Sequence, residues 1–124
     1  MLNQYSKFLL LNAVFAQMLS LQKQVQTADS NIAKNQALLV PLDREDLAPF
    51  EVVQKSNYTN ILAALNAQKV VTVAKLNEIT DKWATMGTIY AGLMVELSQP
   101  NREQDKIRFE ESPLGIAAAA QFPA

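Results

Sequence analysis

Apolar residues recur along residues 11–42 in alternating steps of three and four. One position in this series, Asn35, is polar. A narrow apolar stripe of this length indicates a helix that buries one seam against another helix. Asn35 either sets the register of that seam or marks its opening near the following turn. The ten seam positions are Leu11, Val14, Met18, Leu21, Val25, Ala28, Ile32, Asn35, Leu39 and Leu42.

A second apolar register follows between residues 58 and 97. Its two polar members, Lys69 and Thr72, lie next to valines. Because β-branched residues are weak helix formers, we expect the stripe to shift around the helix there, or the helix to be locally disturbed. The register consists of Tyr58, Leu62, Leu65, Lys69, Thr72, Leu76, Ile79, Trp83, Met86, Tyr90, Leu93 and Leu97.

Prolines set the expected boundaries. Pro41 ends a first helix over about residues 5–40, and Pro100 ends a second helix over about residues 50–98. Between them, residues 41–49 form a charged turn in which Asp46 is the expected N-cap and Pro49 lies in the first helical turn. The predicted fold is therefore all-α: an elongated, coiled-coil-like antiparallel hairpin with a shorter first helix and a long second one.

Residues 101–124 form a C-terminal arm that we expect to be extended. Residues 102–111 carry seven charges. Within them, residues 106–110 alternate between polar and apolar like an edge strand. Residues 113–124, PLGIAAAAQFPA, are small and apolar and lie between prolines. The domain prediction is a hairpin over residues 1–100 followed by this arm.

Folding the two helices about residue 45 predicts which segments meet. Phe15 is expected opposite the region of Leu76, and Phe8 opposite that of Trp83. The uncharged stretches 8–22 and 83–95 then lie together at the end far from the turn. The last turns of the second helix have no partner within the hairpin.

This unmatched stripe and the apolar residues of the arm are the candidate interface. Two interpretations remain open: the chain's own arm completes a core there, or another subunit covers the stripe. Glycine in a helix allows a close approach between helices, which adds Gly87 to the set. The interface candidates are Trp83, Met86, Gly87, Tyr90, Leu93, Met94, Leu97, Phe109, Ile116 and Phe122.

Composition argues against most chemistry. The chain has no Cys and no His, and 11 basic against 12 acidic residues give a net charge of −1. We therefore expect no enzyme, no catalytic residues, no cofactor, no Cys/His metal site and no nucleic-acid partner. Asp43, Glu45 and Asp46 carry oxygen ligands, but their spacing matches no complete Ca²⁺ loop, and a solvated turn is the better interpretation.

Residues 8–22 are uncharged but too short for a membrane span, which needs about 20 apolar residues. Asn12 and Gln17 interrupt them, and a cleavage site after Ala16 fits only weakly. We therefore expect neither a signal peptide nor a transmembrane helix, and the compartment stays unassigned. Contact with a membrane is compatible with this composition but not required by it.

The favoured hypothesis is a non-enzymatic structural subunit whose hairpins pack into a homo-oligomeric part of a larger particle or apparatus. Twenty Asn and Gln residues make its polar faces easier to bury than charged ones. In its two helices and proline-bearing turn, though in no motif, the chain is similar to needle and inner-rod proteins of secretion systems and to internal proteins of phage particles. A virion component or a secretion or translocation assembly is therefore expected. The alternatives are a membrane-active or channel-associated protein and an adaptor or chaperone that binds a partner helix.

Overall fold

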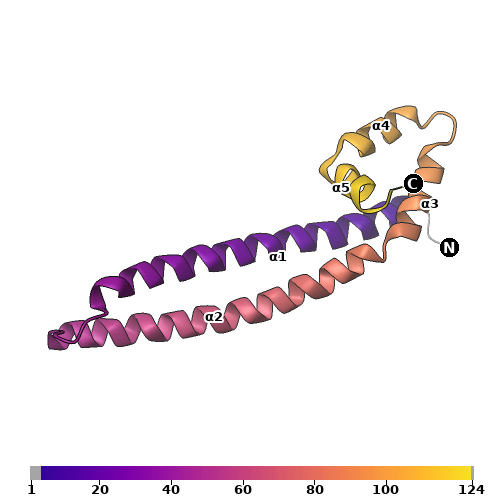
Figure 1. Cartoon of the computed structure of the whole chain (residues 1–124). Coiled ribbons are helices and arrows are strands. Elements are labelled where there is room, and N and C mark those ends of the chain that lie inside the picture. The colour runs from indigo at the N-terminus through magenta and orange to yellow at the C-terminus, as the bar shows by residue number, and fades with distance from the viewer. Residues whose placement is uncertain (1–3, 124) are drawn as a thin grey trace. The chain divides into compact units, whose positions relative to one another are not determined.

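The computed structural model describes residues 4–123, and their regular structure is entirely helical (Figure 1). No strand occurs among these residues, which confirms the predicted all-α class. In chain order the elements are α1 Gln4–Leu39, the short 3₁₀ helix η1 Val40–Leu42, α2 Pro49–Ala84, α3 Gly87–Leu97, α4 Glu103–Glu111 and α5 Pro113–Gln121.

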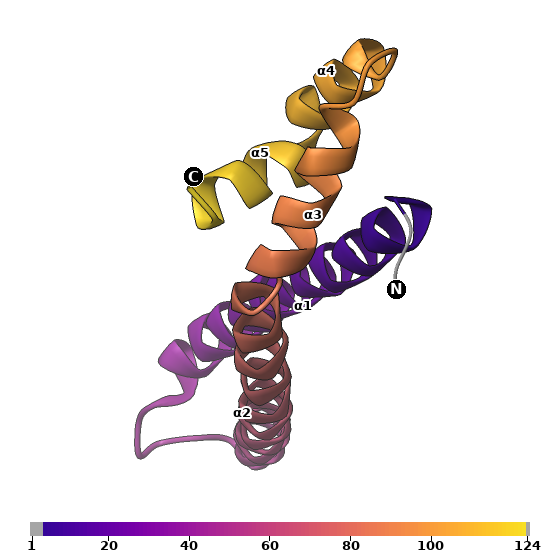
Figure 2. The ribbon, with the colours of Figure 1, turned by 90° about the vertical axis from the view of Figure 1, so that its right-hand side faces the viewer.

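The chain divides into two compact units. Unit 1 holds the described residues of Met1–Leu19 and of Asn77–Ala124, and unit 2 holds Ser20–Leu76. In unit 1, the chain turns back after α3, so that α4 and α5 come over the first turns of α1 (Figures 1 and 2). Unit 2 contains the rest of α1, η1 and most of α2.

The predicted seams match the observed burial. All ten positions of the first register and all twelve of the second are buried or half-buried. The expected shift of the second stripe is wrong, because α2 runs unbroken through this region with Lys69 and Thr72 half-buried in register. Val70 and Val71 are exposed instead. Position in the helical repeat, rather than hydrophobicity, decides which of these side chains is shielded.

The second predicted helix is in fact two helices, separated at Thr85 and Met86. The backbone N–H of Thr85 donates to Lys82 O at 3.1 Å, and that of Met86 donates to Trp83 O at 3.0 Å. The Thr85 hydroxyl also donates to Lys82 O, at 2.7 Å. Bonds over three residues and a hydroxyl that competes for a helix carbonyl both favour ending a helix, so α2 stops here and α3 begins at Gly87.

Arg44 organises the connector between η1 and α2. Its guanidinium donates to Pro41 O at 3.1 Å, to the Asp46 carboxylate at 3.2 Å and to the Glu51 carboxylate. The side-chain hydrogen bond to Asp46 and the negative charge of Glu51 raise the pKa of Arg44 above its ordinary value. Arg44 therefore stays charged and ties the connector to the first turn of α2.

The predicted N-cap at Asp46 is wrong. Ala48 precedes α2, with Pro49 as its first residue as expected. The Glu51 carboxylate accepts from the Ala48 N–H at 3.0 Å. A Glu at the third helical position that reaches back to the cap N–H is one half of a capping box, so the cap needs no side chain of its own.

The C-terminal arm is not extended, and residues 106–110 form no edge strand, because they lie within α4. Asn101 has a φ of 68°, in the left-handed region that Asn tolerates better than most residues, and it lies between α3 and α4. Acidic Glu103 and Asp105 in the first turn of α4 and basic Arg108 in its last turn complement the helix dipole. The same alternation that suggested a strand also suits a helix that buries one residue, Phe109.

A tight turn at Ser112 joins α4 to α5. The Ser112 hydroxyl donates to Phe109 O at 2.6 Å and accepts from the Gly115 N–H at 3.0 Å, and Pro113 is the first residue of α5. A Cβ on Gly115 would lie only 1.8 Å from Phe109 O. Glycine is therefore required at 115 for the two helices to approach this closely.

Candidate functional site

Trp83 is the centre of an aromatic cluster in unit 1. Its ring centroid lies 5.5 Å from that of Phe15 in α1 and 5.5 Å from that of Phe122, which follows α5. Tilted ring pairs at this separation contribute about 0.5–1.5 kcal/mol each beyond the burial of their area. Trp83 is only 3% exposed, so the C-terminal arm covers the indole from within the same chain.

Tyr90 and Phe109 extend this cluster along α3 and α4. The Tyr90 ring lies 5.8 Å from Phe122 and 6.3 Å from Phe109. Phe8 of α1 meets Phe109 edge-on, also at 6.3 Å. The cluster therefore joins α1, α3, α4 and the end of α5.

These contacts differ from the predicted alignment. Phe15 meets Trp83 instead of the region of Leu76, and Phe8 meets Phe109 instead of the region of Trp83. The estimate placed the turn at residue 45 and took both helices as straight and evenly matched. Trp83 lies seven residues after Leu76, so the partner of Phe15 is about two helical turns further along α2 than the estimate placed it.

Most of the ten interface candidates are packed inside unit 1. Around Phe109 and Phe122 the structure has the first of the two interpretations, a core that the chain's own arm completes. Gly87 contributes as expected of a small residue, since a Cβ there would lie 3.3 Å from the Phe122 ring. The set divides into buried Trp83, Met86, Leu93, Leu97 and Phe109, half-buried Gly87, Tyr90, Met94 and Phe122, and exposed Ile116. A contact of these residues with another subunit stays a prediction.

An ion pair ties α1 to α3 beside the cluster. The Lys7 ammonium donates to Glu96 Oε1 at 2.6 Å, and both side chains are mostly shielded from water. Gly92 lies one turn before Glu96, and a Cβ there would lie 3.2 Å from Lys7 Nζ. Because Gly92 has no side chain, the space through which the Lys7 stem reaches the Glu96 carboxylate stays open. The other oxygen, Glu96 Oε2, is buried and has no hydrogen-bond partner among the described residues.

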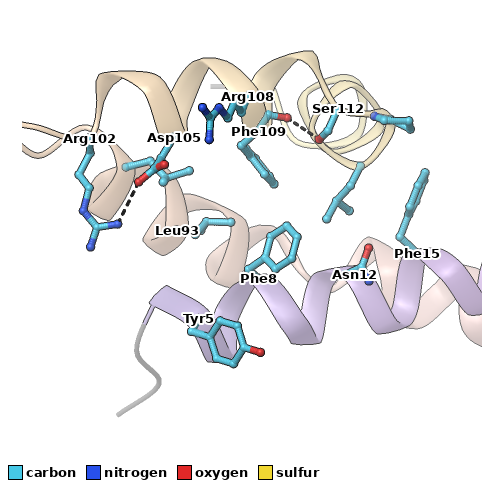
Figure 3. Close-up of a pocket in the computed structure, with 13 residues that line it drawn as sticks. Tyr5, Phe8, Asn12, Phe15, Leu93, Arg102, Asp105, Arg108, Phe109 and Ser112 are labelled. Atoms are coloured by element: carbon cyan, nitrogen blue, oxygen red, sulfur yellow. Dashed lines mark hydrogen bonds and ion pairs between the residues drawn. The ribbon is translucent and has the colours of Figure 1, made fainter.

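Next to the cluster, unit 1 contains an open groove of about 830 Å³, which we call the aromatic groove (Figure 3). In Figure 3, Phe8 from α1, Phe109 from α4 and Leu93 from α3 converge on it. Its outer side remains accessible, because Tyr5 is 70% exposed and Phe8 38%. Its lining consists of Tyr5, Phe8, Asn12, Phe15, Leu93, Leu97, Arg102, Asp105, Arg108, Phe109, Ser112, Pro113 and Leu114.

The charged groups of the aromatic groove come from α4 and the residue before it. Arg102 pairs with Asp105 at 3.4 Å. Arg108 is exposed and makes no ion pair among residues 4–123. The lining therefore combines an apolar interior with one uncompensated guanidinium, an arrangement typical of sites that bind an apolar group bearing a negative charge.

A second group of exposed apolar side chains lies on either side of the connector in unit 2 and was missed by the sequence analysis. Val40 is 72% exposed and Phe50 66%, next to a connector rich in acidic residues. These side chains fall outside both heptad registers. The sequence signal that could have found them is a set of apolar residues off the register beside prolines. We call these exposed residues on the two sides of the connector the connector tip; they are Leu38, Val40, Phe50, Val52 and Val53.

The acidic side chains of the described residues do not gather into a metal site. No group of three or more Asp or Glu side chains is placed to hold a metal ion in the part of the chain that the structure describes. In the acidic connector, the Asp46 carboxylate is already bound to Arg44. None of the described helices is long and apolar enough to cross a membrane.

Comparisons with protein-family models, with curated proteins and with solved structures gave no match to this chain. The function must therefore be argued from its own surfaces.

Proposed function

We propose that this chain is a non-enzymatic helical subunit that associates with copies of itself within a larger assembly. One observation carries the proposal: after both seams and the arm have packed, the connector tip and the aromatic groove still expose large apolar side chains. Exposed apolar side chains that gather in a groove or beside a turn are candidate association surfaces. Both surfaces also lie on well-formed helices and on a connector held by Arg44, so they are pre-organised for contact.

As part of this proposal, α1 and α2 pair as an antiparallel, coiled-coil-like hairpin. One cross-helix contact in each unit supports it: Phe15 with Trp83 in unit 1, and the ion pair of Asp29 with Lys69 in unit 2. Each contact joins α1 to α2 within its own unit, so each unit supports the proposed pairing separately.

Sedimentation velocity on the full chain over a wide range of concentration tests the association. We expect species whose mass is a multiple of 13.7 kDa and whose share rises with concentration. A single species of one-chain mass at every concentration would contradict self-association.

The open groove also favours a second candidate, an adaptor that takes up a helix of a different protein. Monomeric behaviour combined with tight one-to-one binding of an apolar helix would support the adaptor instead. Flotation with vesicles of neutral or anionic lipid tests the membrane alternative, and no association at any lipid composition would contradict it.

A further inference from the structure

We infer that the connector tip of one copy docks into the aromatic groove of a second copy, an arrangement that rests on the self-association proposed above. Each chain carries both surfaces, one in unit 2 and one in unit 1. The two surfaces differ in form, because the tip presents exposed side chains and the groove is a concave space.

The connector tip suits insertion because it is apolar, exposed and held in place. Phe50 and Val53 lie three residues apart on α2 and therefore share one face. Arg44 binds Pro41 O on one side and Glu51 on the other, which fixes the connector against α2. Docking a surface that is already ordered avoids the entropic cost of ordering it on binding.

The aromatic groove suits reception because it is apolar and of sufficient size. Its volume of about 830 Å³ is within the range of clefts that hold drug-sized ligands. Such ligands are similar in size to a few side chains. Phe8, Phe15 and Phe109 provide aromatic walls for another aromatic ring. Phe50, with 66% of its surface exposed, is the ring of the tip best placed to be the anchor, since interface hot spots favour buried aromatic side chains.

The charges of the two surfaces are complementary. The groove lining holds Arg102 and Arg108 against the single acid Asp105, and Arg108 has no ion-pair partner among the described residues. On the connector, Asp43 and Glu45 are exposed and equally without an ion pair in the described part of the chain. A carboxylate that meets a guanidinium at the rim forms a charge-assisted hydrogen bond, which sets orientation as well as affinity.

Such a contact is heterologous, because different surfaces of the two copies meet. Every docked pair leaves one free tip and one free groove, so growth continues until the assembly closes into a ring or extends as a filament. Because two different surfaces meet, two variants that are each damaged on a different surface should still bind each other. A symmetric contact between identical surfaces would not give this result.

The test uses two variants of the full chain, each damaged on one surface. Phe50→Ser with Val53→Ser removes the tip but leaves the groove, and Arg108→Glu reverses the groove charge but leaves the tip. These side chains are exposed, so circular dichroism should show unchanged helix content. If Arg108→Glu loses helix, Arg108→Ser replaces it.

We expect sedimentation velocity to show each variant alone associating at least tenfold more weakly than the wild type. An equimolar mixture should form one-to-one dimers and stop there, because the intact tip of one variant fits the intact groove of the other. Ile61→Ser on α2 and Lys106→Glu on α4 are the matched controls, and both should assemble like the wild type.

The outcomes separate the two proposals. A monomeric wild type overturns both self-association and the docking inference. A wild type that assembles while both variants assemble equally well overturns the inference and leaves self-association intact. Two weakened variants whose mixture forms no dimer also overturn the inference, because the surfaces then do not bind each other.

Discussion

The indole of Trp83 packs against the ring of Phe122, with the ring centroids 5.5 Å apart, and this contact fastens the C-terminal arm to the rest of unit 1. The two residues are 39 positions apart in the chain and belong to segments with different local patterns. Because the chain holds a single tryptophan, the contact can be followed by fluorescence.

Phe122→Ala should expose Trp83 and lower the free energy of unfolding. Fully buried Phe→Ala changes cost about 3–5 kcal/mol, and because Phe122 is half-buried we expect roughly 1–3 kcal/mol. The tryptophan emission should shift to longer wavelength as water reaches the indole. Ile116→Ala, at a side chain of the same arm that is 59% exposed, should change stability by less than about 0.5 kcal/mol.

Gly115→Ala should destabilise the turn between α4 and α5. The new Cβ would meet the carbonyl oxygen of Phe109, a backbone atom that cannot move without displacing α4, and we expect a loss of about 1–3 kcal/mol in urea unfolding. Gly92→Ala is the comparison variant. Its Cβ would meet the side chain of Lys7 at 3.2 Å instead of a backbone atom, and alanine has the better helix propensity, so we expect a smaller loss than at Gly115.

Lys7→Met should lower stability by about 1–3 kcal/mol, because it leaves the shielded Glu96 carboxylate without a donor among the described residues. Adding Glu96→Gln to Lys7→Met removes the unpaired charge and should restore part of the loss. Arg102→Met breaks the exposed pair with Asp105 and should cost no more than about 0.5 kcal/mol. Equal losses for Lys7→Met and Arg102→Met in urea unfolding would refute this assignment.

Exchanging the charges of Asp29 and Lys69 tests the proposed hairpin register in unit 2. Asp29→Lys or Lys69→Asp alone should each cost roughly 0.2–1 kcal/mol, since the pair is partly exposed. The double variant should recover most of that loss, because the two charges still face each other with opposite sign. Thermal unfolding of the four proteins gives the coupling energy, and a coupling of zero at low salt would argue against the pairing.

The seams are where sequence reasoning succeeded. Leu11, Val14 and Met18 are buried because a helical repeat places residues three and four apart on one face whatever the rest of the chain does. Lys69 and Thr72 follow the same rule, since both are half-buried at seam positions although their side chains are polar. Reading polarity residue by residue at that point produced the wrong expectation of a shifted stripe.

The C-terminal arm is where it failed. Residues 106–110 fit a strand and a helix equally well by local pattern, and the helix formed here buries Phe109 against Phe8 and Tyr90. The turn signal of Ser112 and Pro113 was present in the sequence, but the 1.8 Å approach that makes Gly115 necessary exists only once α4 and α5 have packed. The exposed tip at Val40 and Phe50 had a local signal, apolar residues off the register beside prolines, but only the tertiary structure decides that they are exposed.

By itself, the sequence determined the helical class and the side of each long helix that is shielded, because both follow from short-range spacing along one chain. Only the tertiary structure decided that the arm covers Trp83 and that a groove with a free Arg108 lies beside it. These features depend on contacts between residues far apart in sequence, such as Trp83 with Phe122, and no local pattern specifies which distant side chain fills a given space.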